Sequence, residues 1–109
     1  MRSLERTAPF VRITAVAGGR EALLGHVRSL FDAHACDPAF VSGSIHRSVD
    51  EADVVVVHEV WNESREVFGR RLTTAEAFTT HGARAEPFVA KREVTWLESP
   101  ALWRCDHAS

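Results

Sequence analysis

One run of eight residues, VVVVHEVW at 54–61, constrains the fold of this chain more than any other feature. Its β-branched residues predict a strand. Apolar side chains fall on both of its faces: Val55, Val57 and Trp61 on one, Val54, Val56 and Val60 on the other. A strand that is apolar on both faces must be covered on both faces. A chain of 109 residues has helices enough for one side only, so we expect a second copy of the chain to cover the other.

The remaining periodicity predicts three more strands and a first helix. Strands are expected at 10–16, 40–47 and 88–97, where short apolar segments are bounded by glycine, proline or acidic residues. A helix is expected from Arg20 to about Ala35, because its apolar residues are spaced four, three and one apart and share one face. His34 continues that apolar stripe.

A second helical region follows the third strand and is broken in two. Ser64 can cap a short helix that carries Phe68 on its apolar face. Thr73, followed three residues later by Glu76, resembles a capping box that opens another short helix through about Ala83. The two helices precede the last strand.

The resulting order, β-α-β-β-α-β, is the split βαβ arrangement. It predicts an α+β, ferredoxin-like domain with an antiparallel four-stranded sheet and helices on one face. We expect this domain at 10–98, a flexible arm at 1–9 and a C-terminal tail at 99–109. Burial of apolar surface contributes about 25 cal/mol per Å², so the open sheet face favours a homodimer.

Charge and composition exclude several classes of function. The net charge of −2 and the pI of about 6.3 do not favour nucleic-acid or membrane partners. No apolar run approaches the roughly 18 residues of a membrane span, and the charged N-terminus does not resemble a signal peptide, so a cytoplasmic protein is expected. Two cysteines and six scattered histidines lack the spacing of a metal site, and no glycine-rich phosphate loop follows a strand.

Several segments, taken in order, resemble the antibiotic-biosynthesis-monooxygenase family, whose members are small dimeric α+β barrels. The segments are VRITAV before a helix, His46-Arg47-Ser48 leading into Asp50, and Glu59-Val60-Trp61 ahead of Glu63-Ser64-Arg65-Glu66. Members of this family oxidise anthrones or quinols without metal or flavin, degrade haem, or process small signalling molecules. The resemblance implies a pocket between the sheet and the helices of one subunit.

The resemblance carries over to some functional positions and not to others. Trp61 matches the strand tryptophan of the anthrone-oxidising members, but Val57 stands where those members have asparagine. His81 falls close to the helix histidine that binds iron in the haem-degrading members. In those members an asparagine and a tryptophan stand where this chain has Val11 and Arg71.

Histidine is the side chain best suited to take a proton from a substrate at neutral pH. His81 lies in a short helix and shares a face with Phe78, so it is the preferred base and pocket residue. His34 is the second candidate, although a histidine on an apolar stripe is more often a hydrogen-bonded core residue. Trp61, Phe78 and Phe68 are expected to wall the pocket against a planar substrate.

Charged residues near this pocket have two possible roles. Glu59 shares a strand face with Trp61, and a buried carboxylate requires a partner or a raised pKa. Glu59 is therefore interpreted either as a general base or as the ion-pair partner of an arginine on a neighbouring strand (Arg12, Arg47 or Arg92). Arg71 or Arg47 is expected to stabilise developing oxyanion charge.

These residues favour a cofactor-independent monooxygenase that oxidises a planar aromatic substrate, with dioxygen as co-substrate. One alternative is a haem-binding or haem-degrading protein with His81 as the iron ligand. Another is a non-catalytic dimeric module that binds a small ligand. Fold-level analogy does not separate them.

Overall fold

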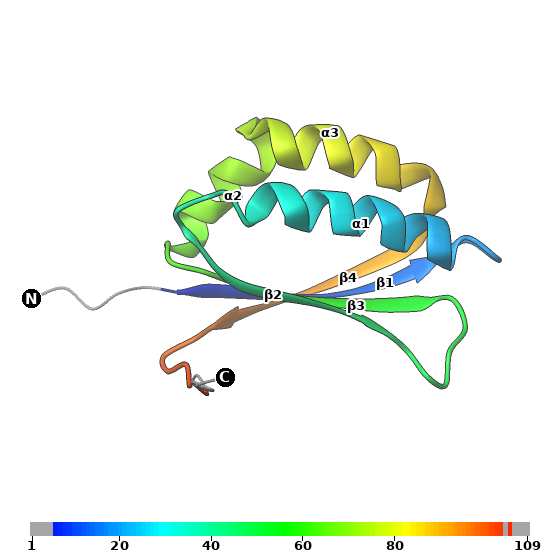
Figure 1. Cartoon of the computed structure of the whole chain (residues 1–109), viewed down its shortest axis with the longest axis horizontal. Coiled ribbons are helices and arrows are strands. Elements are labelled where there is room, and N and C mark those ends of the chain that lie inside the picture. Colours follow the sequence, from blue (N-terminus) through cyan, green and yellow to red (C-terminus); the bar gives the residue numbers. More distant parts are fainter. Residues whose placement is uncertain (1–5, 104, 106–109) are drawn as a thin grey trace, which may run out of the picture.

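The computed structural model describes residues 6–103 and 105, and within them a four-stranded antiparallel sheet carries three α-helices on one face (Figure 1). The elements are β1 (Thr7–Ala15), α1 (Arg20–His34), β2 (Phe40–Arg47), β3 (Val54–Trp61), α2 (Arg65–Thr74), α3 (Glu76–Ala85), a 3-10 turn η1 (Glu86–Phe88) and β4 (Val89–Glu98). The spatial order of the strands is β2-β3-β1-β4. The predicted α+β, ferredoxin-like fold is confirmed.

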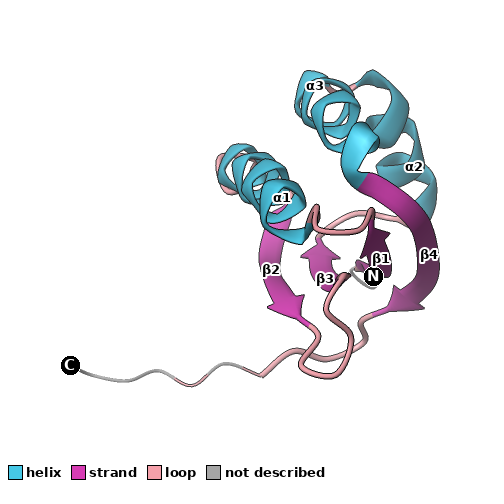
Figure 2. Cartoon of the chain, turned by 90° about the vertical axis from the view of Figure 1, so that its right-hand side faces the viewer, coloured by secondary structure: helices cyan, strands magenta, loops and turns pink. Residues whose placement is uncertain are grey.

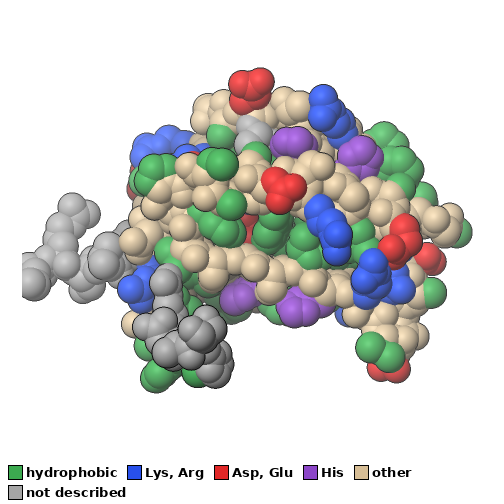
Figure 3. Space-filling model, in the orientation of Figure 1, with side chains coloured by type: hydrophobic (Ala, Val, Ile, Leu, Met, Phe, Trp, Pro, Cys, Tyr) green, Lys and Arg blue, Asp and Glu red, His purple; other side chains and the backbone are tan. Residues whose placement is uncertain are grey.

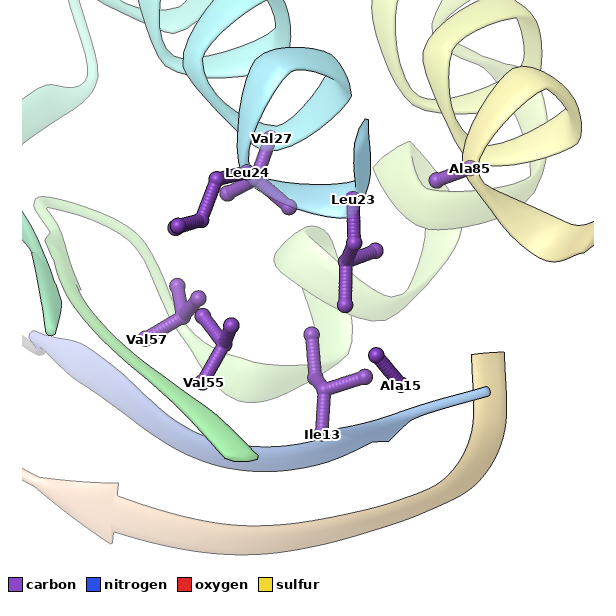
Figure 4. Close-up of a cluster of buried hydrophobic side chains, with 8 residues drawn as sticks. All are labelled: Ile13, Ala15, Leu23, Leu24, Val27, Val55, Val57 and Ala85. Atoms are coloured by element: carbon purple, nitrogen blue, oxygen red, sulfur yellow. The ribbon is translucent and has the colours of Figure 1, made fainter. Parts of the chain in front are cut away.

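The core lies between the helices and the two central strands. In the antiparallel pairing of β1 with β3, Val11 lies opposite Val57 and Ile13 opposite Val55, so these side chains share the helix-facing side. Leu23 and Val27 of α1 pack onto them (Figure 4). The other face of the sheet carries no helix in the described part of the chain. The sheet is curved, and β2 and β4 are its edge strands (Figure 2).

The first strand is longer than its sequence predicts. β1 begins at Thr7, so residues 7–9 of the expected arm belong to the strand, and residues 1–5 lie outside the described residues. Thr7 pairs with Trp61 and with Glu98, and its hydroxyl donates to the carbonyl of Glu63 at 2.9 Å. Backbone pairing with both β3 and β4 therefore extends the strand into residues whose local sequence does not predict one.

The break between α2 and α3 does not involve the expected capping box. The Ser64 prediction is confirmed, because its hydroxyl accepts a hydrogen bond from the Val67 amide at 3.2 Å. Thr73, in contrast, lies in the last turn of α2 and its hydroxyl donates to the Arg70 carbonyl at 3.1 Å. Threonine commonly makes such a bond to its own helix. The N-cap of α3 is Ala75, with extended backbone and no side-chain bond.

The open sheet face is less exposed than the valine pattern predicts. Val54 and Val60 are already 3% and 2% exposed within one chain, while Val56 is only partly buried. A valine is small, and cross-strand neighbours on the same face can cover it. The larger apolar side chains on this face remain accessible: Phe10 is 39% and Leu97 45% exposed.

Candidate functional site

A pocket of about 330 Å³ lies between α1, α3 and the helix-facing side of the sheet. Most of its lining is aliphatic or aromatic, including Val57, Phe68 and Phe78. Five side chains that line it can carry charge: His26, Glu59, His81, Glu86 and Arg92. An apolar pocket with a few polar groups is the usual form of a small-molecule site.

An aromatic cluster backs one end of this pocket. Trp61 is fully buried, and its ring centroid lies 5.3 Å from that of Phe68 and 6.0 Å from that of Phe78. Phe68 and Phe78 line the pocket as expected, but Trp61 does not. The indole therefore supports the two phenylalanines from behind, which corrects its interpretation as a wall in contact with substrate.

Glu59 and His34 meet inside this cluster. The Trp61 Nε1–H donates to Glu59 Oε1 at 3.1 Å, and His34 Nε2 lies 3.6 Å from the same oxygen. Glu59 is 7% and His34 2% exposed. The ring of His34 lies 4.4 Å from Phe78 and 4.9 Å from Trp61, centroid to centroid. His34 is thus a core residue beside the pocket and not among the residues that line it.

The expected ion pair between Glu59 and a strand arginine is not formed. Each of the three arginines has another carboxylate partner: Arg12 pairs with Glu51, Arg47 with Glu21 and Arg92 with Glu86. These partners lie at exposed positions, where a long arginine side chain keeps its charge in water. Glu59 is therefore a buried carboxyl without a cationic partner among the described residues.

Burial moves the pKa values of Glu59 and His34 in opposite directions. Burial raises the pKa of Glu59 to about 7, although the hydrogen bond from Trp61 partly opposes this. Burial lowers the pKa of His34 to about 4; the Asp37 carboxylate opposes this, and His81 and Arg71 add to it. Both groups are then neutral between about pH 4 and about pH 7. The 3.6 Å contact, although within ion-pair reach, joins two neutral groups, because charging both in this site is costly.

His81 lines the pocket, as the sequence predicts, and its Nδ1 is buried without a hydrogen-bond partner among the described residues. A buried ring nitrogen without a partner costs free energy unless a ligand satisfies it. Of the two histidines that line the pocket, His26 and His81, only His81 has a buried ring nitrogen without a partner among the described residues. His34 Nε2 is also without a hydrogen bond, but it lies behind the lining.

The two arginines expected to stabilise negative charge lie outside the pocket. Arg71 binds Glu63 through two hydrogen bonds of 2.8 and 2.9 Å and Asp37 through one of 2.6 Å. Arg47 binds both oxygens of Glu21 on the surface, at 3.0 and 2.8 Å. Nearby carboxylates match the guanidinium geometry and hold both side chains away from the pocket.

Sequence reasoning missed the charged end of the pocket. His26, Glu86 and Arg92 line it; His26 stacks on Phe88 at 5.4 Å, and Arg92 pairs with Glu86 at 3.3 Å. The signal for Arg92 is strand alternation, because it shares the helix-facing side of β4 with Val94 and Trp96, which also line the pocket.

A glycine in β2 makes room for one pocket wall. Gly43 lies opposite Glu59 in the sheet, and the ring of Phe31 packs directly against it. A Cβ at position 43 would overlap the Phe31 ring and come within 2.8 Å of the Phe40 side chain. The Phe31 ring takes its present place in the pocket wall because position 43 has no side chain.

Other classes of site leave no trace in the described residues. No three His, Cys, Asp or Glu side chains in the described part of the chain gather to hold a metal ion. No helix in residues 6–103 is long and apolar enough to cross a membrane. On the face seen in Figure 3, acidic and basic side chains are interspersed.

Fold and pocket define a small ferredoxin-like α+β domain with a largely apolar pocket between its helices and its sheet. A Nitrosomonas europaea protein, provisionally named an antibiotic biosynthesis monooxygenase, has this fold with a TM-score of 0.77 and 16% identity, over 91% of this chain and 94% of that one. A Caulobacter crescentus protein with the same provisional name gives 0.76 and 17%, over 88% and 91%. A Pseudomonas aeruginosa protein, whose name states no function, gives 0.75 and 21%, over 93% and 99%.

No protein-family model and no curated protein matches the sequence. The structural similarity nevertheless shows that the chain has the fold of the antibiotic-biosynthesis-monooxygenase structures, as its sequence segments predict. At these identities the likeness concerns the fold, and the activity has to be argued from the pocket.

Proposed function

We propose that this protein is a cofactor-independent monooxygenase that oxidises a planar aromatic substrate (an anthrone, a quinol or a polyketide-like ring) with dioxygen. The observation that carries the proposal is the pocket: apolar and aromatic walls, with the His81 ring nitrogen and the Glu59 carboxyl as its polar groups beside the aromatic cluster. The provisional names of two proteins with this fold point the same way.

The chemistry needs a base, a binding surface and exclusion of water. Loss of a proton from the central methylene of an anthrone gives a carbanion whose charge is shared with the keto oxygen. The carbanion reduces dioxygen; one oxygen atom becomes the new ring carbonyl and the other leaves as water. The substrate supplies all four electrons, so no external reductant is required.

Each part of this task has a residue in the pocket. His81 accepts the proton through its free ring nitrogen, a step typically worth 10²–10⁴-fold in rate. Phe68 and Phe78 hold the aromatic ring, with Trp61 packed behind them. The apolar walls keep water from the carbanion.

The proposed assembly is a homodimer formed through the sheet face opposite the helices. Phe10 and Leu97 expose apolar surface there, and Val56 of β3, opposite Arg12, is only partly buried on the same face. No helix in the described residues covers this face. Burying it against the same face of a second copy gives the isologous contact typical of homodimers.

Oxygen uptake tests the proposal. The wild-type protein should consume dioxygen with an anthrone or hydroquinone, and the rate should fall at least about 100-fold in His81→Ala. His46→Ala is the matched control, because His46 is an exposed histidine on the other face of the sheet. A ring that binds without oxygen uptake would favour the non-catalytic module.

Haem is the competing ligand, and His81 is the residue that would hold its iron. The pocket volume of about 330 Å³ is near the lower end of the range for ligand sites, which favours a small ring system over a macrocycle. Titration with haem should therefore give no stoichiometric Soret band. A tight complex that His81→Ala abolishes would replace the cofactor-independent proposal with the haem one.

A further inference from the structure

A substrate that loses a proton in this pocket places negative charge on an oxygen, and that charge requires a hydrogen-bond donor. Arg71 and Arg47, the donors expected from the sequence, are bound to carboxylates outside the pocket. The cation that lines the pocket, Arg92, is paired with Glu86 and lies opposite Ile13. Because Ile13 pairs with Val55, Arg92 is four residue levels from Glu59, or roughly 13 Å along the strands.

Glu59 is a polar group that lines the pocket beside the aromatic cluster. Its Oε1 accepts the Trp61 Nε1–H at 3.1 Å and lies 3.6 Å from His34 Nε2. Its other oxygen, Oε2, has no hydrogen bond to a described residue. Trp61 therefore fixes one carboxyl oxygen and leaves the other for a ligand.

The groups around Glu59 do not supply a cation that would ionise it. From α1, His34 is buried and neutral; from α3, His81 lies near enough to influence His34. From α2, Arg71 is neutralised by Glu63 and by Asp37 of the loop that follows α1. A carboxyl in such surroundings keeps its proton, and burial indeed raises the pKa of Glu59 to about 7.

We propose that Glu59, in its neutral form, donates a hydrogen bond from Oε2 to the oxygen of an aromatic phenolate or enolate bound in the pocket. This inference rests on the proposed function and narrows its substrate class to rings that carry an ionisable hydroxyl or a keto group beside an acidic carbon. The substrate proton goes to His81, and the Glu59 proton is shared with the substrate oxygen without leaving the carboxyl. A neutral carboxylic acid can serve in this way in a dry site.

A nitrophenol, whose neutral and ionised forms absorb at different wavelengths, reports this hydrogen bond without any oxidation. Bound to the wild-type protein at pH 6, the dye should be more ionised than it is free in solution. Glu59→Gln retains an N–H donor and should preserve the effect. Glu59→Leu removes the donor and should abolish it, while an apolar side chain of similar size is tolerated in a buried site.

The pH dependence separates a donor from a base. As pH rises past about 7, wild-type Glu59 ionises and repels the phenolate, so dye affinity should fall at least about tenfold by pH 8.5. Glu59→Gln cannot ionise, so its affinity should stay level over this range. Trp61→Phe removes a hydrogen bond that lowers the pKa of Glu59, so the fall should move to higher pH.

Two results would overturn the inference: loss of the ionisation effect in Glu59→Gln as complete as in Glu59→Leu, or no binding of the dye to the wild-type protein. The proposed oxygenase is judged separately, by oxygen uptake. Dye ionisation that depends on Glu59 without oxygen uptake would support this inference and reject the oxygenase. Oxygen uptake by a protein that does not change the ionisation of the bound dye would support the oxygenase and reject this inference.

Discussion

At the scale of single residues, Glu59 and His34 affect stability in opposite directions as pH changes. Glu59 has a pKa of about 7 when folded and an ordinary value of 4.5, so between these values only the folded state holds the proton. Its contribution is present below about pH 4.5 and is lost as pH rises to about 7. The pKa of His34 is about 4 when folded and ordinarily 6.5, so its contribution to stability is lost as pH falls from 6.5 to 4.

The two effects should nearly cancel in the wild-type protein and appear separately in single variants. In Glu59→Gln only the effect of His34 remains of the two, so the free energy of unfolding should rise between pH 4 and 6.5, by about 3 kcal/mol at most. In His34→Gln it should fall by a similar amount between pH 4.5 and 7. Urea unfolding across this range measures both slopes. If the free energy of unfolding changed with pH in the same direction in both variants, Glu59 and His34 would not act in opposite directions.

Gly43 permits a further test at this scale. Gly43→Ala places a methyl group against the rings of Phe31 and Phe40, so Phe31 should be pushed toward the pocket and weaken binding of a planar ligand at least about tenfold. Gly25→Ala in α1 is the matched control, because a Cβ there meets nothing within 4 Å. It should leave binding unchanged and add about 0.5–1 kcal/mol of stability. Calorimetric titration of both variants makes the comparison.

At the scale of elements, Arg71 fixes α2 to the loop between α1 and β2. It binds Glu63 before α2 and Asp37 after α1, and its guanidinium carbon lies 5.6 Å from the centre of the Trp61 ring. These ion pairs of Arg71, here called the Arg71 cluster, hold α2, which carries Phe68, against the aromatic cluster. Sequence patterns identified the helix, but not this attachment.

Removal of the Arg71 side chain should lower the free energy of unfolding more than removal of the exposed Arg70 side chain. Arg71→Met leaves the Glu63 side chain, only 8% exposed, without its cation and should lower the free energy of unfolding by about 1–3 kcal/mol. Arg70→Met breaks a pair with Glu66 whose side chains are 69% and 84% exposed, and should cost no more than about 0.5 kcal/mol. Denaturant midpoints of the two variants decide the question, and equal losses would show that the Arg71 cluster adds nothing.

At the scale of the whole molecule, the proposed dimer depends on the sheet face opposite the helices. Val56→Asp places a charge on the same sheet face as the exposed Phe10 and Leu97 and should convert the dimer to a monomer of 12.1 kDa. Val49→Asp is the control: Val49 is 98% exposed in the turn between β2 and β3 and should not affect assembly. Light scattering at micromolar concentration measures both masses. A wild-type monomer would reject the dimer.

The sequence alone determined the elements and their order, because strand alternation, helical periodicity and caps are local. The bounds of β2 and β3 and the Ser64 cap followed from neighbouring residues. Local pattern also proposed a cap at Thr73, where the side chain instead bonds within its own helix.

Only the tertiary structure decided how the charged residues are used. Arg71 meets Asp37 across 34 residues of chain, and the pKa of Glu59 is raised because helices and strands distant in sequence exclude water from it. Trp61 lies behind the pocket wall because Phe68 and Phe78, from two later helices, pack in front of it. The energy of a charge depends on which groups surround it in space, and sequence periodicity carries no information on that.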